Sequence, residues 1–198
     1  SNSVLSIKIK KIALKNFKGF EDIEISFSDR FNLLLGNNGS GKTAVLDALG
    51  LILNSIFIGF DETEKRYQIN DEDVRQVSNT YGDEIRMEPN YPASIEAQGV
   101  VMEYPVHWIK RRSGSQSQSD DVDWDLTAIT AGFNQHVRKG NPVILPVIAY
   151  YGTGRLWLHM DDEKVEPIPP VSRFHAYKDC LDPRSNEKEL IRWMKEQE

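Results

Sequence analysis

Residues 36–43, Gly-Asn-Asn-Gly-Ser-Gly-Lys-Thr, form the stretch whose residue types and spacing predict chemistry most directly. A glycine followed by four residues and then Gly-Lys-Thr is typical of a phosphate-binding loop, or P-loop. The glycines permit backbone conformations that side chains forbid, so that amide hydrogens converge on phosphate oxygens. The Lys42 ammonium would reach the β- and γ-phosphates as the catalytic cation, and the Thr43 hydroxyl would coordinate Mg²⁺. The residues predicted to bind the nucleotide here are Gly36, Asn37, Asn38, Gly39, Ser40, Gly41, Lys42, Thr43 and Ala44.

A phosphate loop of this kind connects a strand to a helix. The run Phe-Asn-Leu-Leu-Leu at 31–35 is continuously apolar and predicts a buried central strand. Residues 42–57 have apolar side chains at helical spacing and predict a helix. The order of strand, glycine loop and helix therefore supports ATP or GTP with Mg²⁺ as the ligand.

The segments before the loop predict an antiparallel strand pair. Residues 7–17 and 21–27 alternate apolar and polar side chains, and Lys18-Gly19-Phe20 predicts the turn between them. We therefore expect an α/β fold, a P-loop NTPase lobe with an antiparallel N-terminal strand pair and a central strand–P-loop–helix unit.

The rest of the chain predicts a mixture of connectors, strands and helices. We expect domain boundaries that give segments 1–60, 61–165 and 166–198, the last a linker and helix. We expect a polar connector at 61–93 with a helical turn near 71–77, and strands in 94–111 with Pro105 at an edge or bulge. A mobile low-complexity loop is expected at 112–121, followed by a helix at 123–139 that Gly140 stops. The last expectations are a buried strand at 143–151, a linker at 167–170 and a helix at 186–197.

Composition indicates a soluble cytoplasmic protein. The hydrophobic content is 39%, no apolar run is long enough to span a bilayer, and Cys180 is the single cysteine. The net charge of −6 argues against a generally basic surface, although residues 1–20 contain five lysines and no acid. Solvated lysines on a strand face and a basic edge for phosphates both remain open. The start, Ser1-Asn2-Ser3, is interpreted as a tag remnant.

The motif and its surroundings resemble the SMC, RecF and OLD group of ABC-type ATPases. Residues 9–49, IKKIALKNFKGFEDIEISFSDRFNLLLGNNGSGKTAVLDAL, carry that resemblance. It implies that Lys15, Asn16, Phe17 and Lys18 lie beside the adenine, ribose or phosphates. The alternative for the lysines is an exposed turn.

Residues 145–157, LPVIAYYGTGRLW, resemble a bacterial subgroup of predicted ATP-binding proteins labelled virulence-associated, related to ATPases of anti-phage systems such as Septu and some retrons. This resemblance implies that Tyr151, Gly152, Thr153 and Arg155 lie near the γ-phosphate. A structural ion pair is the alternative role for Arg155.

The group needs a signature segment and a Walker B strand, which this sequence does not supply convincingly. The run RSGSQ at 112–116 only imitates the signature, and LWLHMDDE at 156–163 only imitates Walker B. We interpret the chain as the N-terminal portion of a longer ATPase. We expect it to bind nucleotide weakly and to turn over below about 1 s⁻¹.

Three functions remain open on the sequence. The first is an ATPase whose heads dimerise around ATP with a second copy, and which acts on DNA or a partner nuclease in genome maintenance or anti-phage defence. The second is a P-loop small-molecule kinase, which would need clustered lid arginines; Arg111 and Arg112 are the adjacent pair. The third is a nucleotide-binding scaffold module.

Overall fold

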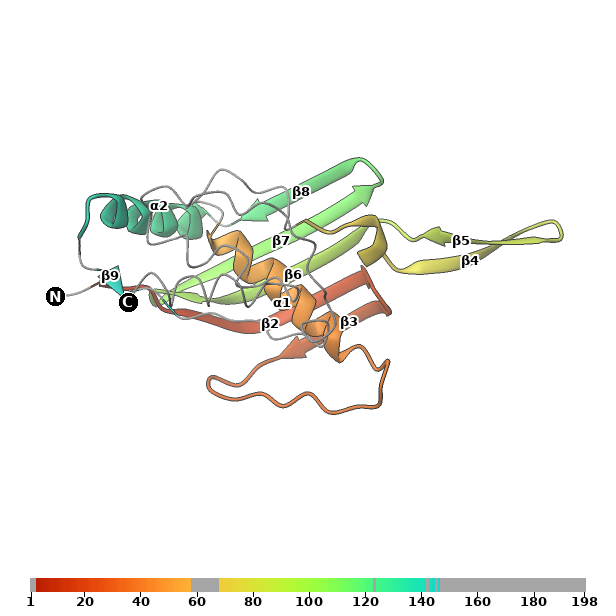
Figure 1. Ribbon diagram of the computed structural model, residues 1–198, viewed down its shortest axis with the longest axis horizontal. Coiled ribbons are helices and arrows are strands. Elements are labelled where there is room, and N and C mark those ends of the chain that lie inside the picture. Colours follow the sequence, from red (N-terminus) through yellow and green to blue (C-terminus); the bar gives the residue numbers. More distant parts are fainter. Residues whose placement is uncertain (1–2, 58–67, 123, 142, 145, 147–198) are drawn as a thin grey trace, which may run out of the picture. The chain divides into compact units, whose positions relative to one another are not determined.

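A five-stranded antiparallel sheet forms the centre of the computed structural model, which describes residues 3–57, 68–122, 124–141, 143–144 and 146 (Figure 1). These residues belong to one compact unit, Ser1–Pro146. The strand order is β3-β2-β6-β7-β8. The strands are β2 (Ile7–Phe17), β3 (Phe20–Ser26), β6 (Ala93–Val101), β7 (Tyr104–Gly114) and β8 (Ser117–Val122). The predicted strand pair is confirmed, with Ile12 opposite Ile25 and Leu14 opposite Ile23.

Two helices, α1 (Lys42–Phe57) and α2 (Trp124–Arg138), lie over one face of this sheet and contact each other (Figure 1). Both helices were predicted from their apolar spacing. Gly140, with φ +71°, follows α2 as expected for a helix stop. The core between helices and sheet is made by Ile12, Leu14, Ala48, Ile52, Ile95, Ala97 and Trp108, each at most 1% exposed. No helix in the described part of the chain is long and apolar enough to cross a membrane.

The opposite face of the sheet is charged, and its lysines have acidic partners. Lys11 pairs with Glu24 at 3.0 Å and Lys15 pairs with Asp22 at 3.8 Å, both across the β2–β3 ladder. Lys8 lies 3.6 Å from Asp29. These contacts favour a solvated face for these lysines over a free basic edge.

A bulge between Ile9 and Lys11 interrupts the ladder between β2 and β6. Because side chains alternate along a strand, one extra residue exchanges the faces of all residues that follow it. Gly99 lies opposite the bulge, where a Cβ atom would come within 2.2 Å of the Lys8 carbonyl oxygen. The bulge and this glycine together fix the register of β2.

Two smaller sheets accompany the central one. Strands β1 (Ser3–Val4) and β9 (Val143–Ile144) pair in parallel. The buried strand predicted at 143–151 is thus a strand at its start only; Ile144 is 49% exposed and Pro146 lies outside the strand. Residues 147–151 are not described. Strands β4 (Gln76–Tyr81) and β5 (Glu84–Pro89) form an antiparallel hairpin beyond the end of the central sheet (Figure 1). A 3₁₀ helix, η2 (Asp71–Asp73), precedes β4.

The prediction of a buried central strand at 31–35 is wrong for this structure. No described strand pairs with these residues, and Phe31, Leu33 and Leu35 are 76%, 66% and 82% exposed. An apolar run becomes a buried strand only where neighbouring strands and covering layers are available. The Asn32 side chain also accepts from the Ser28 amide at 2.7 Å, which turns the chain there.

The segments expected to be irregular form hairpins instead. The predicted polar connector contains β4 and β5, which Gly82, with φ +64°, and Asp83 join. The predicted mobile loop at 112–121 contains the end of β7 and most of β8. Both predictions failed because polar edge strands lack the alternation of half-buried ones; their backbone ladders hold them in place. The RSGSQ run at 112–116 comprises the end of β7 and the turn to β8, and a strand rather than a helix follows it.

The prediction for Pro105 on β7 is confirmed, and the predictions for the last part of the chain lie outside the described residues. Pro105 lies in the part of β7 that β8 does not reach, so its missing amide hydrogen costs no ladder bond on that side. The predictions for Tyr151, Gly152, Thr153, Arg155, the Walker B imitation at 156–163, the linker at 167–170 and the helix at 186–197 lie outside the described residues.

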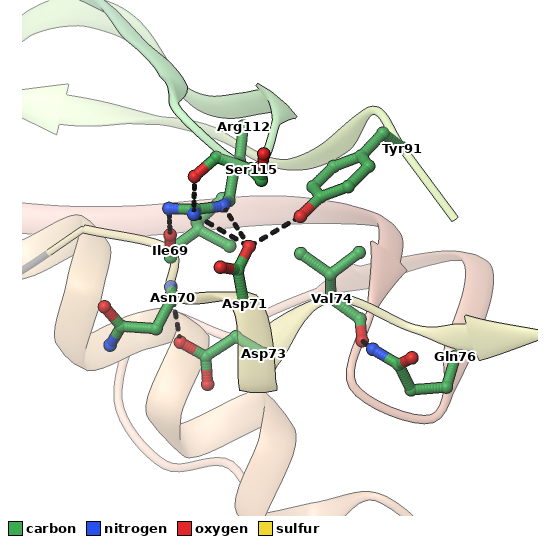
Figure 2. A network of polar contacts seen from close by, with 9 residues as sticks. All are labelled: Ile69, Asn70, Asp71, Asp73, Val74, Gln76, Tyr91, Arg112 and Ser115. Carbon is green, nitrogen blue, oxygen red and sulfur yellow. Dashed lines mark hydrogen bonds and ion pairs between the residues drawn. The ribbon is translucent and has the colours of Figure 1, made fainter. Parts of the chain in front are cut away.

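Arg112 on β7 connects the sheet to the segment before η2 (Figure 2). Its side chain is 8% exposed; it donates to the Ile69 and Ser115 carbonyl oxygens at 2.9 and 2.5 Å and pairs with Asp71 at 2.7 Å. The Tyr91 hydroxyl donates to the same carboxylate at 2.5 Å. This hydrogen bond, aided by Arg112, lowers the pKa of Asp71 below its ordinary value.

We expect Arg112→Met to lower the free energy of unfolding by about 2–3 kcal/mol, because the buried Ile69 residue loses the donor to its carbonyl oxygen and Asp71 loses its ion pair. Urea unfolding measures this change. Arg86→Met is the control: Arg86 pairs with Glu84 where both side chains are well exposed, so the expected change is below about 1 kcal/mol. Equal effects of the two substitutions would contradict the role given to Arg112.

Candidate nucleotide-binding site

The loop at 36–41 turns tightly into helix α1. Gly39 and Gly41 have φ values of +83° and +90°, which favour glycine. The Ser40 amide donates to the Asn37 carbonyl at 3.1 Å, and the Val45 amide donates to the Gly41 carbonyl at 3.1 Å, which begins the helix. A Cβ atom at Gly36 would lie 2.4 Å from the Ser40 hydroxyl oxygen. The backbone conformation therefore favours glycine at positions 39 and 41, and Gly36 leaves room for the Ser40 side chain.

The Lys42 ammonium lies against its own loop. It donates to the Gly36 and Asn37 carbonyl oxygens at 2.5 and 2.7 Å, and lies 3.3 Å from the Ser40 hydroxyl. A cation held by neutral carbonyl groups alone can exchange them for phosphate oxygens, with which it forms stronger charge-assisted bonds.

The first turn of α1 is suited to an anion. Thr43 is exposed there, and the turn contains no acidic residue. The unpaired amide groups at a helix N-terminus carry partial positive charge. Thr43 thus presents a hydroxyl beside a favourable place for phosphate, as a Mg²⁺ ligand would need.

The turn between β2 and β3 packs against this loop. A Cβ atom at Gly41 would lie 2.3 Å from the Phe20 ring, so the ring occupies the space beside that glycine. Phe20 opens β3, directly after Lys18 and Gly19. The strand pair therefore contacts the phosphate loop itself.

Lys18 forms a second contact between the same turn and α1. Its ammonium lies 2.5 Å from an Asp47 carboxylate oxygen on α1 and 3.4 Å from an Asp73 oxygen on η2. Burial alone would lower the pKa of Lys18, but the hydrogen bond and charge of Asp47, with a smaller contribution from Asp73, raise that pKa above its ordinary value. Lys18 is therefore a cation held by two carboxylates.

The other residues that the resemblance placed beside the nucleotide lie in different surroundings. Lys15 is on the charged outer face of the sheet with Asp22. Phe17 is fully buried, and Asn16 donates to the Pro92 carbonyl at 3.0 Å. Asn37 and Asn38 are exposed and Ala44 is buried. Arg155 lies outside the described residues. Nucleotide contacts by these residues stay predictions.

Sequence reasoning missed Phe20, Asp47 and Asp73. Asp47 carried a signal, since an acidic residue within an apolar helical run needs a cation nearby. Asp73 lies in a polar segment, and Phe20 was interpreted only as part of a turn. Neither had a pattern that pointed to the loop.

Gly41→Ala should destabilise the protein more than Gly39→Ala, by about 1–3 kcal/mol in urea unfolding. Both positions have positive φ, so backbone strain is similar, but only position 41 faces the Phe20 ring. Phe20→Ala should remove most of the difference between the two alanine variants. If the difference persists in that background, the ring is not its cause.

Curated relatives match short stretches of this chain. The DNA replication and repair protein RecF of Lactococcus lactis subsp. cremoris is 44% identical over 43 residues, 22% of this chain and 12% of that protein. RecF of Leptospira biflexa is 32% identical over 84 residues, 40% of this chain and 22% of that protein. Structural maintenance of chromosomes protein 6 of Saccharomyces cerevisiae is 45% identical over 47 residues, 24% of this chain and 4% of that protein. The matched parts thus span under a quarter of these relatives.

Two solved structures are also similar. One, described as "Structural biochemistry of ATP-driven dimerization and DNA stimulated activation of SMC ATPases", is 19% identical with a TM-score of 0.41, over 63% of this chain and 79% of that chain. The SMC head domain from Thermotoga maritima is 22% identical with a TM-score of 0.37, over 59% of this chain and 37% of that chain.

The relatives support the predicted resemblance to the SMC and RecF group. The finer resemblance to virulence-associated and Septu proteins stays a prediction. A family model described as an AAA domain matches residues 11–198, and the chain therefore belongs to this AAA domain family.

Proposed function

We propose that this chain is the ATP-binding part of an ATPase of the SMC and RecF type. The observation that carries the proposal is the glycine loop before α1, with Gly39 and Gly41 at positive φ and the Lys42 ammonium on the loop carbonyls. These groups fit a triphosphate, because the amide hydrogens at a helix N-terminus favour an anion and Lys42 supplies a cation beside them. Thr43 would hold Mg²⁺, which supplies charge neutralisation between the phosphates when bound.

The kinase alternative has less support. A lid of clustered arginines would use Arg111 and Arg112, but Arg112 is 8% exposed and bound to Ile69, Asp71 and Ser115. A buried guanidinium with these partners would lose them on reaching a phosphate. The scaffold alternative remains as a chain that binds nucleotide without turnover.

We expect Lys42→Met to weaken binding of Mg²⁺–ATP by at least about 100-fold, because a charge-assisted contact to phosphate is lost. Isothermal titration calorimetry with a non-hydrolysable ATP analogue measures the affinity. Lys11→Met is the matched control, because Lys11 pairs with Glu24 on the outer face of the sheet. Thr43→Val should remove the dependence of affinity on Mg²⁺. Wild-type protein that binds no nucleotide would reject the proposed function.

In the finer proposal, two copies bind face to face through ATP and the pair acts on DNA. Of these two parts, the name of a relative, DNA replication and repair protein RecF, supports only the action on DNA. A partner nuclease and a role in anti-phage defence are further proposals of the same kind. The outer lysines already have acidic partners, so any DNA surface would have to lie elsewhere or form with ATP.

We therefore expect DNA binding that requires ATP and weakens steeply as salt increases, because phosphate contacts release counterions. Fluorescence anisotropy of labelled duplex DNA at several salt concentrations measures both dependences. Lys42→Met is the control that removes ATP binding. Binding that is unchanged by salt or by ATP would contradict this finer proposal, while leaving ATP binding itself untouched.

A further inference from the structure

We propose that Lys18 is a positioning residue for the phosphate loop rather than a phosphate ligand. In this proposal its ammonium fastens the β2–β3 turn to helix α1 and to η2, so that Phe20 stays against Gly41. The proposal rests on the ATP site proposed above and adds a residue that sets the affinity of that site from outside it.

The contacts of Lys18 join three elements that are distant in sequence. Asp47 lies in the second turn of α1, and Asp73 ends η2. The two carboxylate side chains are 19% and 14% exposed, so water competes weakly with the Lys18 ammonium for them. Lys18 is the cation that these two largely buried acids share. Moving Lys18 to a phosphate would leave both acids near each other without their shared cation.

The backbone of this turn is strained and held from outside. Asn16 and Lys18 have φ values of +45° and +50°, which residues other than glycine seldom adopt. Hydrogen bonds from neighbouring segments hold both residues: the Lys18 amide donates to the Asp73 carbonyl at 2.6 Å, and the Arg75 amide donates to the Asn16 carbonyl at 2.8 Å. Such strain persists only where the surroundings fix it, and it is commonest at functional sites.

The turn contacts the glycine loop through the Phe20 side chain. Only Gly19 separates Lys18 from Phe20, and the Phe20 ring fills the space beside Gly41. Gly41 lies between the loop and the first helical residue, Lys42. A displacement of the turn would therefore change the conformations available to Gly41, and with them the directions of the neighbouring amide groups proposed to bind phosphate.

The test compares the affinities of ATP and ADP in purified Lys18→Met protein by calorimetry. A positioning residue should weaken both nucleotides by the same factor, about tenfold, which corresponds to about 1.4 kcal/mol. A direct ligand of the terminal phosphate would weaken ATP far more than ADP. Equal losses support the proposal, and a selective loss for ATP overturns it.

Three further variants separate positioning from folding. Lys18→Arg should keep the affinities for ATP and ADP within about threefold of wild type, because the arginine side chain can pair with the same carboxylates. If Lys18→Met fails to fold, Asp47→Asn takes its place. It removes a charged partner of Lys18 and should weaken the affinities for ATP and ADP by the same factor. Lys11→Met, which breaks the pair with Glu24 on the same strand, should change neither affinity.

A spectroscopic readout needs no nucleotide. The amide resonances of Gly39 and Gly41 should move in Lys18→Met and stay in Lys11→Met. Unmoved resonances with wild-type affinities would overturn the positioning role while the wild-type protein still binds ATP. Wild-type protein without ATP affinity would instead overturn the proposed function, so the two failures are distinguishable.

Discussion

The contact between the β2–β3 turn and the start of α1 is the constraint on which the candidate site depends. Lys18 bonds to Asp47 across this contact, and Phe20 packs on Gly41 beside it. The glycine loop is otherwise exposed along its length. An exposed loop rich in glycine has high conformational freedom, which binding would have to remove. The adjoining turn restricts that freedom before any ligand arrives.

The helices and the paired strands were predictable because their patterns depend on burial. Residues 7–17 alternate and became β2, and residues 42–57 have helical spacing and became α1. In both cases one face packs into the core, and the geometry of the helix or strand sets the spacing of the apolar residues on that face. The turn at residues 36–41 was predictable for a different reason: Gly39 and Gly41 have positive φ values, a backbone geometry that is local to the loop.

The segments that sequence did not predict are those whose structure comes from partners. Residues 31–35 look like a buried strand, but apolar composition cannot specify a neighbour, and none of the described strands pairs with them. Conversely, the 112–121 tract looks irregular, yet it forms an edge strand because β7 offers an open ladder. The Lys18 contacts were likewise out of reach, since they join residues 29 and 55 positions apart whose spacing carries no period.

The bulge in β2 divides the strand into two parts whose inward-facing positions differ. Before it, Ile7 and Ile9 lie opposite Val101 and Gly99; after it, Ile12 and Leu14 point into the core. The inward side chains are therefore at odd positions before the bulge and at even positions directly after it, as far as Leu14. When β2 is aligned with a strand that has no bulge, leaving out a one-residue gap near Lys10 would assign the side chains after it to the wrong face. The bulge is thus the reference point for this strand: equivalent positions in another strand face the same side only when they are counted from the bulge.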